Sequence, residues 1–119
     1  MATEKDFVER ISRIAGVSGC LLMKNDGTLL AQTMADTEVY SPLLQISTGL
    51  SDEIMSSAGF SYCRYLSFNR INDQAFYIFP IEKYLLGVIQ QTDCSVNAML
   101  EQVFHLIGRV STGRGNPAG

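Results

Sequence analysis

The fold is decided by residues 60–91, FSYCRYLSFNRINDQAFYIFPIEKYLLGVIQQ, which hold three strand-like stretches with no helical pattern between them. We expect strands at 60–68, 74–81 and 84–91, because aromatic and β-branched residues favour strands. The chain reverses at the mostly polar residues 69–73 and again at Glu82-Lys83. Such short connections join antiparallel neighbours, since parallel strands need a crossover of a dozen residues or more. The segment therefore predicts an antiparallel sheet.

The first of these stretches has the pattern of an edge strand. Two-residue alternation places one charged and four apolar residues on the same face. A charge within such a row indicates an edge or an interface rather than a sealed core. The five residues are Phe60, Tyr62, Arg64, Leu66 and Phe68.

The rest of the chain adds a hairpin and three helices. Strands at 17–24 and 28–34 flank Asn25-Asp26-Gly27, a turn in which glycine supplies a positive φ. Helices are expected from a Thr3–Asp6 capping box to Gly16, from Ser41-Pro42 to Ala58 with Gly59 as a stop, and from a cap at Asp93 or Ser95 to Val110.

The element order is α-β-β-α-β-β-β-α, which predicts an α+β domain with one largely antiparallel five-stranded sheet. The terminal helices are expected on one face and the middle helix on the other. We place the domain at residues 1–110 and a flexible tail at 111–119, because the tail lacks apolar residues.

The composition narrows the class of protein. The chain has 119 residues, is 46% hydrophobic and carries a formal net charge of −3, which fits one globular domain. The acidic balance argues against nucleic acid as a partner, and no apolar run is long enough to span a membrane. Three widely spaced cysteines and a start without a signal core predict a cytoplasmic protein.

No pattern for catalysis stands out, and we expect no catalytic, cofactor or metal site. His105 is expected to point away from the apolar stripe of the last helix, four residues after Glu101. Cys94 lies at a helix start, where a thiol pKa can fall, but no histidine base is evident beside it. Gly113-Arg114-Gly115 follows a helix, so it lacks the context of a phosphate-binding loop.

The middle helix carries two apolar rows roughly 100° apart. We expect the larger row to face the sheet: Leu43, Ile46, Ser47, Leu50, Ile54 and Ala58. The second row then faces outward: Leu44, Thr48, Ser51 and Met55. The helix alone leaves two interpretations, a contact surface for another chain or scattered exposed apolar residues.

The chain resembles the Roadblock (dynein light chain type) domain family, in particular its short bacterial and archaeal members. The resemblance covers about residues 4–110 and is carried by GVSGCLLMKNDGTLLAQ, SSAGFSYCRYLSF and YIFPIEKYLLGVIQQTDCSVNAMLEQV. These are diffuse hydrophobic patterns, and profilin-like and longin-like domains share the general layout. The resemblance implies strand order 2-1-5-4-3 and dimerisation through the third strand and the middle helix, with Gly49 allowing close approach.

Family members bind or regulate small Ras-like GTPases in polarity, motility or trafficking. The resemblance thus implies a non-catalytic homodimeric module with a Ras-like GTPase as partner. Arg64 and Arg70 are considered for a finger-like charge, but a rim or dimer salt bridge is the preferred role. The expected interface residues are Leu44, Thr48, Ser51, Met55, Tyr62, Arg64 and Leu66.

Two other classes of function stay open. A small-molecule sensor or general scaffold of profilin-like or longin-like layout would use the Tyr and Phe side chains of the sheet to line a pocket. An enzyme built on Cys94 would need an unusually reactive thiol.

Overall fold

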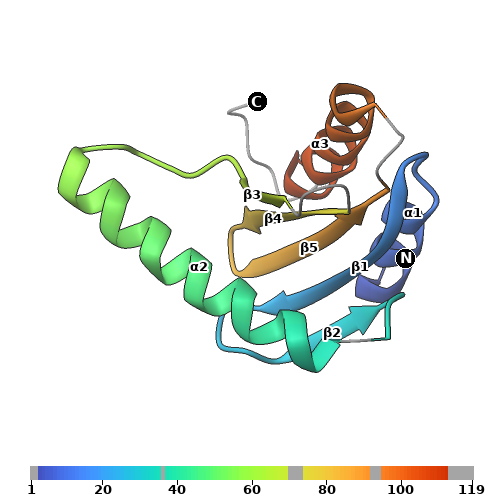
Figure 1. Ribbon diagram of the computed structural model, residues 1–119, viewed down its shortest axis with the longest axis horizontal. Helices are drawn as coiled ribbons and strands as arrows, with labels where there is room; N and C mark the ends of the chain where they lie inside the picture. The colour runs from blue at the N-terminus through green and yellow to red at the C-terminus, as the bar shows by residue number, and fades with distance from the viewer. Residues whose placement is uncertain (1–2, 36, 70–73, 92–94, 113–119) are drawn as a thin grey trace.

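A computed structural model describes residues 3–35, 37–69, 74–91 and 95–112, with side chains described through residue 109 (Figure 1). The elements follow the predicted order. They are α1 (Glu4–Ser12), β1 (Val17–Lys24), β2 (Leu29–Gln32), α2 (Thr37–Ala58), β3 (Leu66–Asn69), β4 (Ala75–Ile81), β5 (Tyr84–Gln90) and α3 (Val96–Thr112).

The five strands form one sheet in the order β2-β1-β5-β4-β3, as predicted. Every neighbouring pair is antiparallel. In the middle of the sheet Leu22 of β1 lies opposite Leu86 of β5, and Ile78 of β4 lies opposite Gly87 of β5. Gly87 is needed there, because a Cβ atom would stand 3.0 Å from the Phe76 ring.

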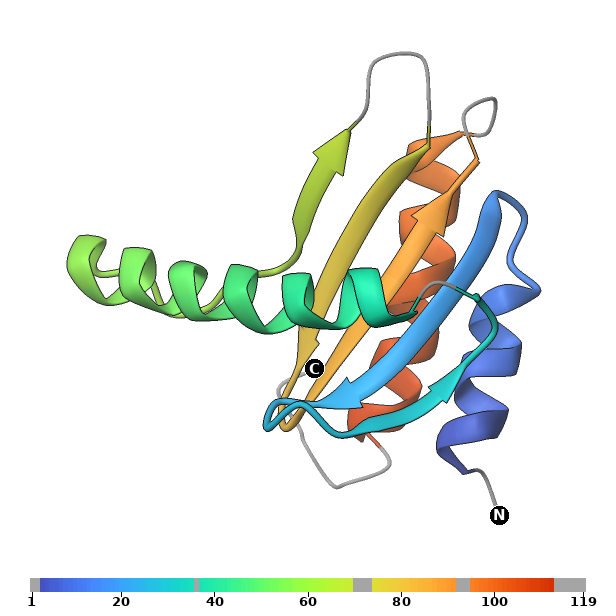
Figure 2. The ribbon, with the colours of Figure 1, turned by 60° about the horizontal axis from the view of Figure 1, so that its bottom comes forward.

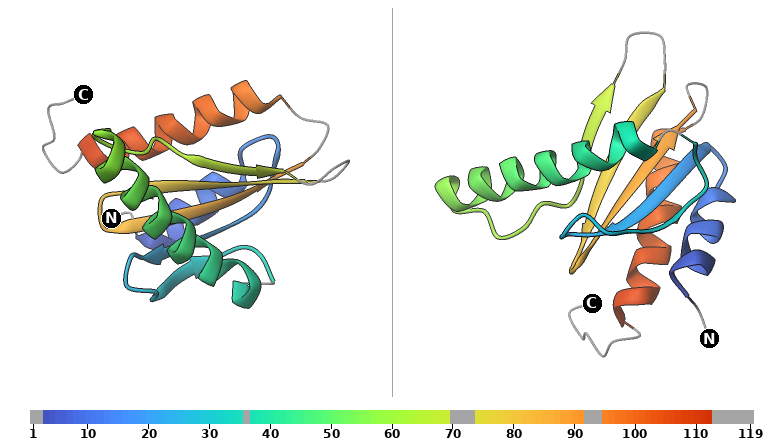
Figure 3. Two further views of the ribbon diagram at one scale, coloured as in Figure 1. Left: turned by 60° about the vertical axis from the view of Figure 1, so that its left-hand side comes forward. Right: turned by 90° about the horizontal axis from the view of Figure 1, so that it is seen from below.

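The helices cover the sheet on both faces, one on one side and two on the other (Figures 2 and 3). Alternate residues of β1 therefore enter two separate cores. On the α1–α3 face, Leu22 and Phe79 pack with residues such as Val8 of α1 and Val103 of α3. On the α2 face, Leu21 packs with residues that include Leu44 of α2. Burial on both faces explains why β1, β4 and β5 are nearly continuous apolar runs.

The local signals for turns and caps are confirmed. Thr3 and Asp6 form the reciprocal hydrogen bonds of a capping box at 3.2 Å. Gly27 turns with φ +102°, and Gly59 ends α2 with φ +80°. The Ser95 hydroxyl accepts a hydrogen bond from the Ala98 N–H, so Ser95 caps α3, whereas Asp93 lies outside the described residues.

Several boundaries differ from the prediction, and the first helix ends at Ser12 rather than continuing to Gly16. α2 begins at Thr37, four residues early, so Pro42 lies inside it. Pro42 is exposed, and water can therefore hydrogen-bond to the carbonyl oxygen that the missing N–H leaves without a helical partner. β2 is limited to 29–32, and α3 continues through Thr112. The predicted tail from residue 113 onward lies outside the described residues.

The third strand is also shorter than predicted, because β3 covers only Leu66–Asn69 rather than 60–68. Its register with β4 pairs Leu66 with Ile78, and one more step of two residues would place Arg64 opposite Pro80. Pro80 has no N–H to donate to a ladder. Residues 60–65 therefore lead to the sheet as an irregular segment.

α2 extends beyond the sheet that it covers. Its 22 residues span about 33 Å at the α-helical rise of 1.5 Å per residue. Figure 2 shows that the C-terminal half projects past β3 into open space, while the N-terminal half crosses the strands. None of the helices in the described ranges combines the length and the hydropathy of a membrane-spanning segment.

Candidate interaction surface

One face of α2 presents large apolar side chains to solvent. They follow each other at spacings of three or four residues, so they line one side of the helix. Their side chains are 43–61% exposed. We call this set the exposed α2 row: Val39, Leu43, Ile46, Leu50 and Ile54.

The sequence predicts that this larger row faces the sheet and that the row with Leu44 faces outward. That prediction is wrong. Leu44, expected to face outward, is fully buried among residues of β1, β4 and β5, and Ser51 is also buried. Leu50 and Ile54, expected against the sheet, are 56% and 61% exposed. A fully buried Leu44 has no surface with which to reach another chain in this conformation.

The packing of α2 on the sheet explains why the row with Leu44 is buried. The sheet supplies most of the large side chains on this face, including Phe76 and Ile78. Tyr40 meets Phe76 with ring centroids 4.8 Å apart, and Leu44 fills the space beside them. Ser51, two turns after Leu44 on the same side of the helix, is buried as well. The larger row therefore faces solvent along the whole of α2, in the half that crosses the strands (Val39, Leu43) as well as in the overhanging half (Leu50, Ile54).

Thr48, another predicted interface residue, is half-buried on α2. Its hydroxyl oxygen is buried without a hydrogen-bond partner in the described part of the chain. Met55 is likewise half-buried. A contact of either residue with another chain stays a prediction.

The outer edge of the sheet lies close to the exposed α2 row. β3 is the last strand of the sheet, and Phe68 on it is 49% exposed. A groove of about 230 Å³ joins the two elements, with Tyr40 and Leu43 of α2 on one side and Phe68 of β3 on the other. Phe60 and Tyr62, which follow α2, are exposed by 65% and 76%. Apolar surface thus continues from the helix to the strand edge.

The remaining predicted interface residues lie on two different sides of the sheet. Leu66 packs against the α2-side core. The Arg64 guanidinium sits 4.3 Å from the centroid of the Phe104 ring of α3, which is cation–π geometry. Arg64 is therefore directed toward the α3 side, away from α2, and Arg70 lies outside the described residues. Sequence alternation cannot show this, because 62–65 are not in a strand.

The thiols and the histidine do not assemble into a reactive group where the chain is described. Burial raises the pKa of the Cys20 thiol to about 11, although a hydrogen bond with the Thr33 hydroxyl opposes the rise. His105 is exposed, as predicted, and Cys94 lies outside the described residues. The same ranges contain no group of three His, Cys, Asp or Glu residues placed to hold a metal ion.

Known structures share this architecture, although no protein-family model and no curated protein sequence matches the chain. MglB from Myxococcus xanthus superposes with a TM-score of 0.80 at 13% identity, over 89% of each chain. A Roadblock/LC7 domain from Streptomyces avermitilis gives 0.73 at 11% identity, over 97% of this chain and all of that one. Profilin IA from Acanthamoeba castellanii gives 0.67 at 16% identity, over 96% and 100%.

The chain therefore has the α+β fold of Roadblock/LC7 domains, and the resemblance read from the sequence is confirmed at the level of the fold. Of these three structures MglB has the highest TM-score. The profilin match confirms that the general layout is shared with profilins. At these identities the likeness concerns the fold alone.

Proposed function

We propose that this protein is a non-catalytic, homodimeric interaction module that binds a small Ras-like GTPase. The observation that carries the proposal is the exposed α2 row, five large apolar side chains on a helix that projects past its own sheet. Contiguous exposed apolar surface is costly in water and marks sites of protein contact.

A second copy of the chain suits this surface because both of its parts can pair with themselves. Two α2 helices can pack with their exposed rows against each other about a two-fold axis, so that the same patch of both copies is buried. The unpaired edge of β3 can extend the sheet into the partner, which removes an exposed edge. In this arrangement Phe60, Tyr62 and Phe68 lose water together with the helix row.

The comparisons support oligomer formation by analogy. One MglB structure with this fold is described as having a tetrameric arrangement. For this chain we propose the dimer as the smallest assembly that covers the exposed α2 row. Light scattering on the purified protein should give a mass of about 26 kDa, twice the 13.1 kDa of one chain.

Binding of a Ras-like GTPase is supported by the Roadblock resemblance. The test is capture of small Ras-like GTPases from the source organism, each loaded with GDP or with a non-hydrolysable GTP analogue. We expect one nucleotide state to be captured in preference to the other. Equal absence of every GTPase in both states would contradict the proposed partner.

The proposed location is the cytoplasm, since Cys20 and Cys63 are free thiols, as a reducing compartment maintains them. The competing sensor function predicts a small molecule that copurifies with the protein. Native mass spectrometry distinguishes the two, because a dimer without a ligand gives twice the mass of the polypeptide, whereas a sensor carries the added mass of the small molecule.

A further inference from the structure

A second surface, on the opposite face of the sheet from α2, concentrates positive charge. α1 and α3 lie side by side there, and a groove of about 680 Å³ runs between them. Three arginines line it, Arg10 and Arg13 from α1 and Arg109 from α3, and no Asp or Glu is among the lining residues. The whole chain has a net charge of −3, whereas the groove is lined by positive charge alone.

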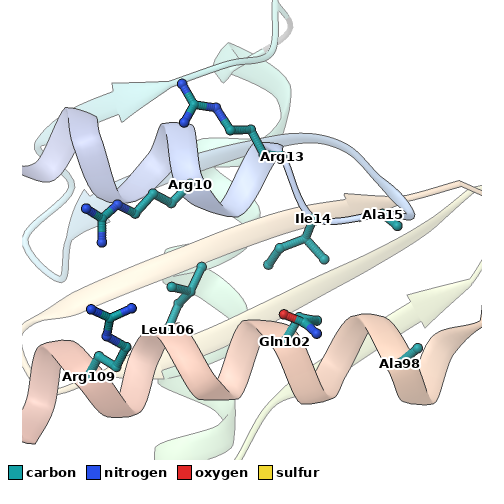
Figure 4. Close-up of a pocket in the computed structure, with 8 residues that line it drawn as sticks. All are labelled: Arg10, Arg13, Ile14, Ala15, Ala98, Gln102, Leu106 and Arg109. Atoms are coloured by element: carbon teal, nitrogen blue, oxygen red, sulfur yellow. The ribbon is translucent and has the colours of Figure 1, made fainter.

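The floor of the groove is apolar. Figure 4 shows Ile14 and Leu106 facing each other between the helices, with Gln102 beside them. Both apolar side chains pack on the core of this face and are only partly buried. The groove therefore offers contact area as well as charge.

Two of the arginines converge on one end of the groove. In Figure 4, Arg10 and Arg109 extend toward one another from the two antiparallel helices, whereas Arg13 points away from α3 at the rim. Because the helices are antiparallel, their last turns, which hold Arg10 and Arg109, lie toward opposite ends of the groove. The Arg10 side chain extends back along α1 and so reaches the end that holds Arg109 (Figure 4).

The acidic residues of α1 do not neutralise this charge. The Asp6 carboxylate accepts a hydrogen bond from the Thr3 N–H in the capping box. Within the described residues neither Arg10 nor Arg13 forms an ion pair, although Asp6 and Glu9 stand four residues before them. Carboxylates from another molecule would meet the planar guanidinium groups in the bidentate geometry that arginine favours.

We propose that the α1–α3 groove binds an acidic, amphipathic segment of a partner protein. The apolar side of that segment lies on Ile14 and Leu106, and its carboxylates meet the Arg10 guanidinium. A groove between two helices favours a peptide, which can reach both the recessed floor and the charged ends. A flat anionic membrane would contact the rim and leave the floor uncovered. The groove lies across the sheet from the exposed α2 row, so its binding is independent of the proposed dimer.

The experiment measures fluorescence anisotropy of a labelled 16-residue synthetic helix that carries Leu on one side and Glu on the other. We expect saturable binding that weakens as salt rises. Charge reversal by Arg10→Glu should weaken it at least tenfold, which corresponds to about 1.4 kcal/mol. Lys24→Glu is the matched control, since it makes the same charge change at an exposed residue at the end of β1 that does not line the groove, and it should leave binding unchanged.

Three results would overturn the proposal. Equal binding of a peptide with Gln in place of Glu would remove the role of carboxylates. Equal loss in Arg10→Glu and Lys24→Glu would show a general charge effect. Binding to vesicles that contain phosphatidylserine, without peptide binding, would identify a membrane surface instead. The variant Leu50→Asp should bind the peptide normally, so the groove proposal can be wrong while the dimer proposal is right, and the reverse. The circular dichroism spectrum of each variant verifies its fold.

Discussion

The same Leu→Ala substitution should lower the free energy of unfolding strongly on the buried face of α2 and only slightly on its exposed face. Leu44→Ala removes a fully buried side chain from the α2-side core, where it packs among Leu21, Phe76 and Ile78. Leu50→Ala removes a side chain that is 56% exposed. Both changes delete the same atoms from the same helix, so the difference in unfolding free energy reports the face alone.

The expected magnitudes follow from burial. A buried Leu→Ala change costs about 2–5 kcal/mol, and we expect about 3 kcal/mol for Leu44→Ala. With an unfolding entropy of about 2.1 cal/mol/K per residue, this lowers the melting temperature by roughly 12 °C. Leu50→Ala should change the stability of the monomer by no more than about 0.5 kcal/mol, which is the usual range at exposed positions.

The assay is urea unfolding followed by circular dichroism at several protein concentrations. The value at the lowest concentration describes the monomer, because self-association stabilises the folded state only where the dimer is populated. If Leu50→Ala is as destabilising as Leu44→Ala at that limit, the assignment of the two faces is refuted. If the effect of Leu50→Ala appears only as concentration rises, the exposed α2 row acts between chains.

Further predictions concern the cap, the sheet and the buried thiol. Thr3→Ala should lower stability by about 1 kcal/mol through loss of the capping box in urea unfolding, whereas Thr3→Ser should retain it. Gly87→Ala should cost about 1–3 kcal/mol because its Cβ would stand 3.0 Å from Phe76, and Gly49→Ala, with no atom within 4 Å, should cost nothing. Burial raises the pKa of Cys20 from 9.0 to about 11, so the folded state holds the thiol proton more tightly. The resulting stability, roughly 2–3 kcal/mol, is present below pH 9 and is lost as pH rises to 11.

Each of these predictions has a contradicting outcome. Equal stability of Thr3→Ala and the unchanged chain would mean that the capping box contributes nothing. A loss in Gly49→Ala as large as in Gly87→Ala would remove the role of the Phe76 contact. For the thiol, the comparison is Cys20→Val, which should decline less between pH 9 and 11 than the unchanged chain, and parallel curves would contradict the assignment.

The element order could be predicted because local signals and hydrophobic periods agree. The turn at Gly27 and the stop at Gly59 each depend on a positive φ that glycine adopts readily, and both signals lie within a few residues of sequence. Short connections then require antiparallel pairing. These features need no knowledge of what packs against what.

The candidate site was harder to predict because it depends on what lies beneath each helix face. Both rows of α2 are apolar, and their spacing cannot show which one the sheet covers. The structure packs the row with Leu44 against the sheet and leaves the row with Leu50 and Ile54 exposed, and this choice is made by tertiary packing. The extent of β3 depends on Pro80 in the neighbouring strand, which alternation within 60–68 does not include.

The direction of Arg64 and the α1–α3 groove show the same limit. Arg64 reaches Phe104 forty residues further along the chain, and Arg10 reaches the same groove end as Arg109. Neither pair has a signal in sequence spacing. They appear only when the tertiary arrangement brings the elements together.

The central claim, that the exposed α2 row joins two copies of the chain, is tested most directly by sedimentation equilibrium of Leu50→Asp against the unchanged protein. The matched control is Ser56→Asp, which adds the same charge at an exposed position about 120° round the helix from the row. We predict about 26 kDa for the unchanged protein and the control, and the 13.1 kDa of a single chain for Leu50→Asp. A monomeric unchanged protein, or a Leu50→Asp variant that remains a dimer, would contradict the claim.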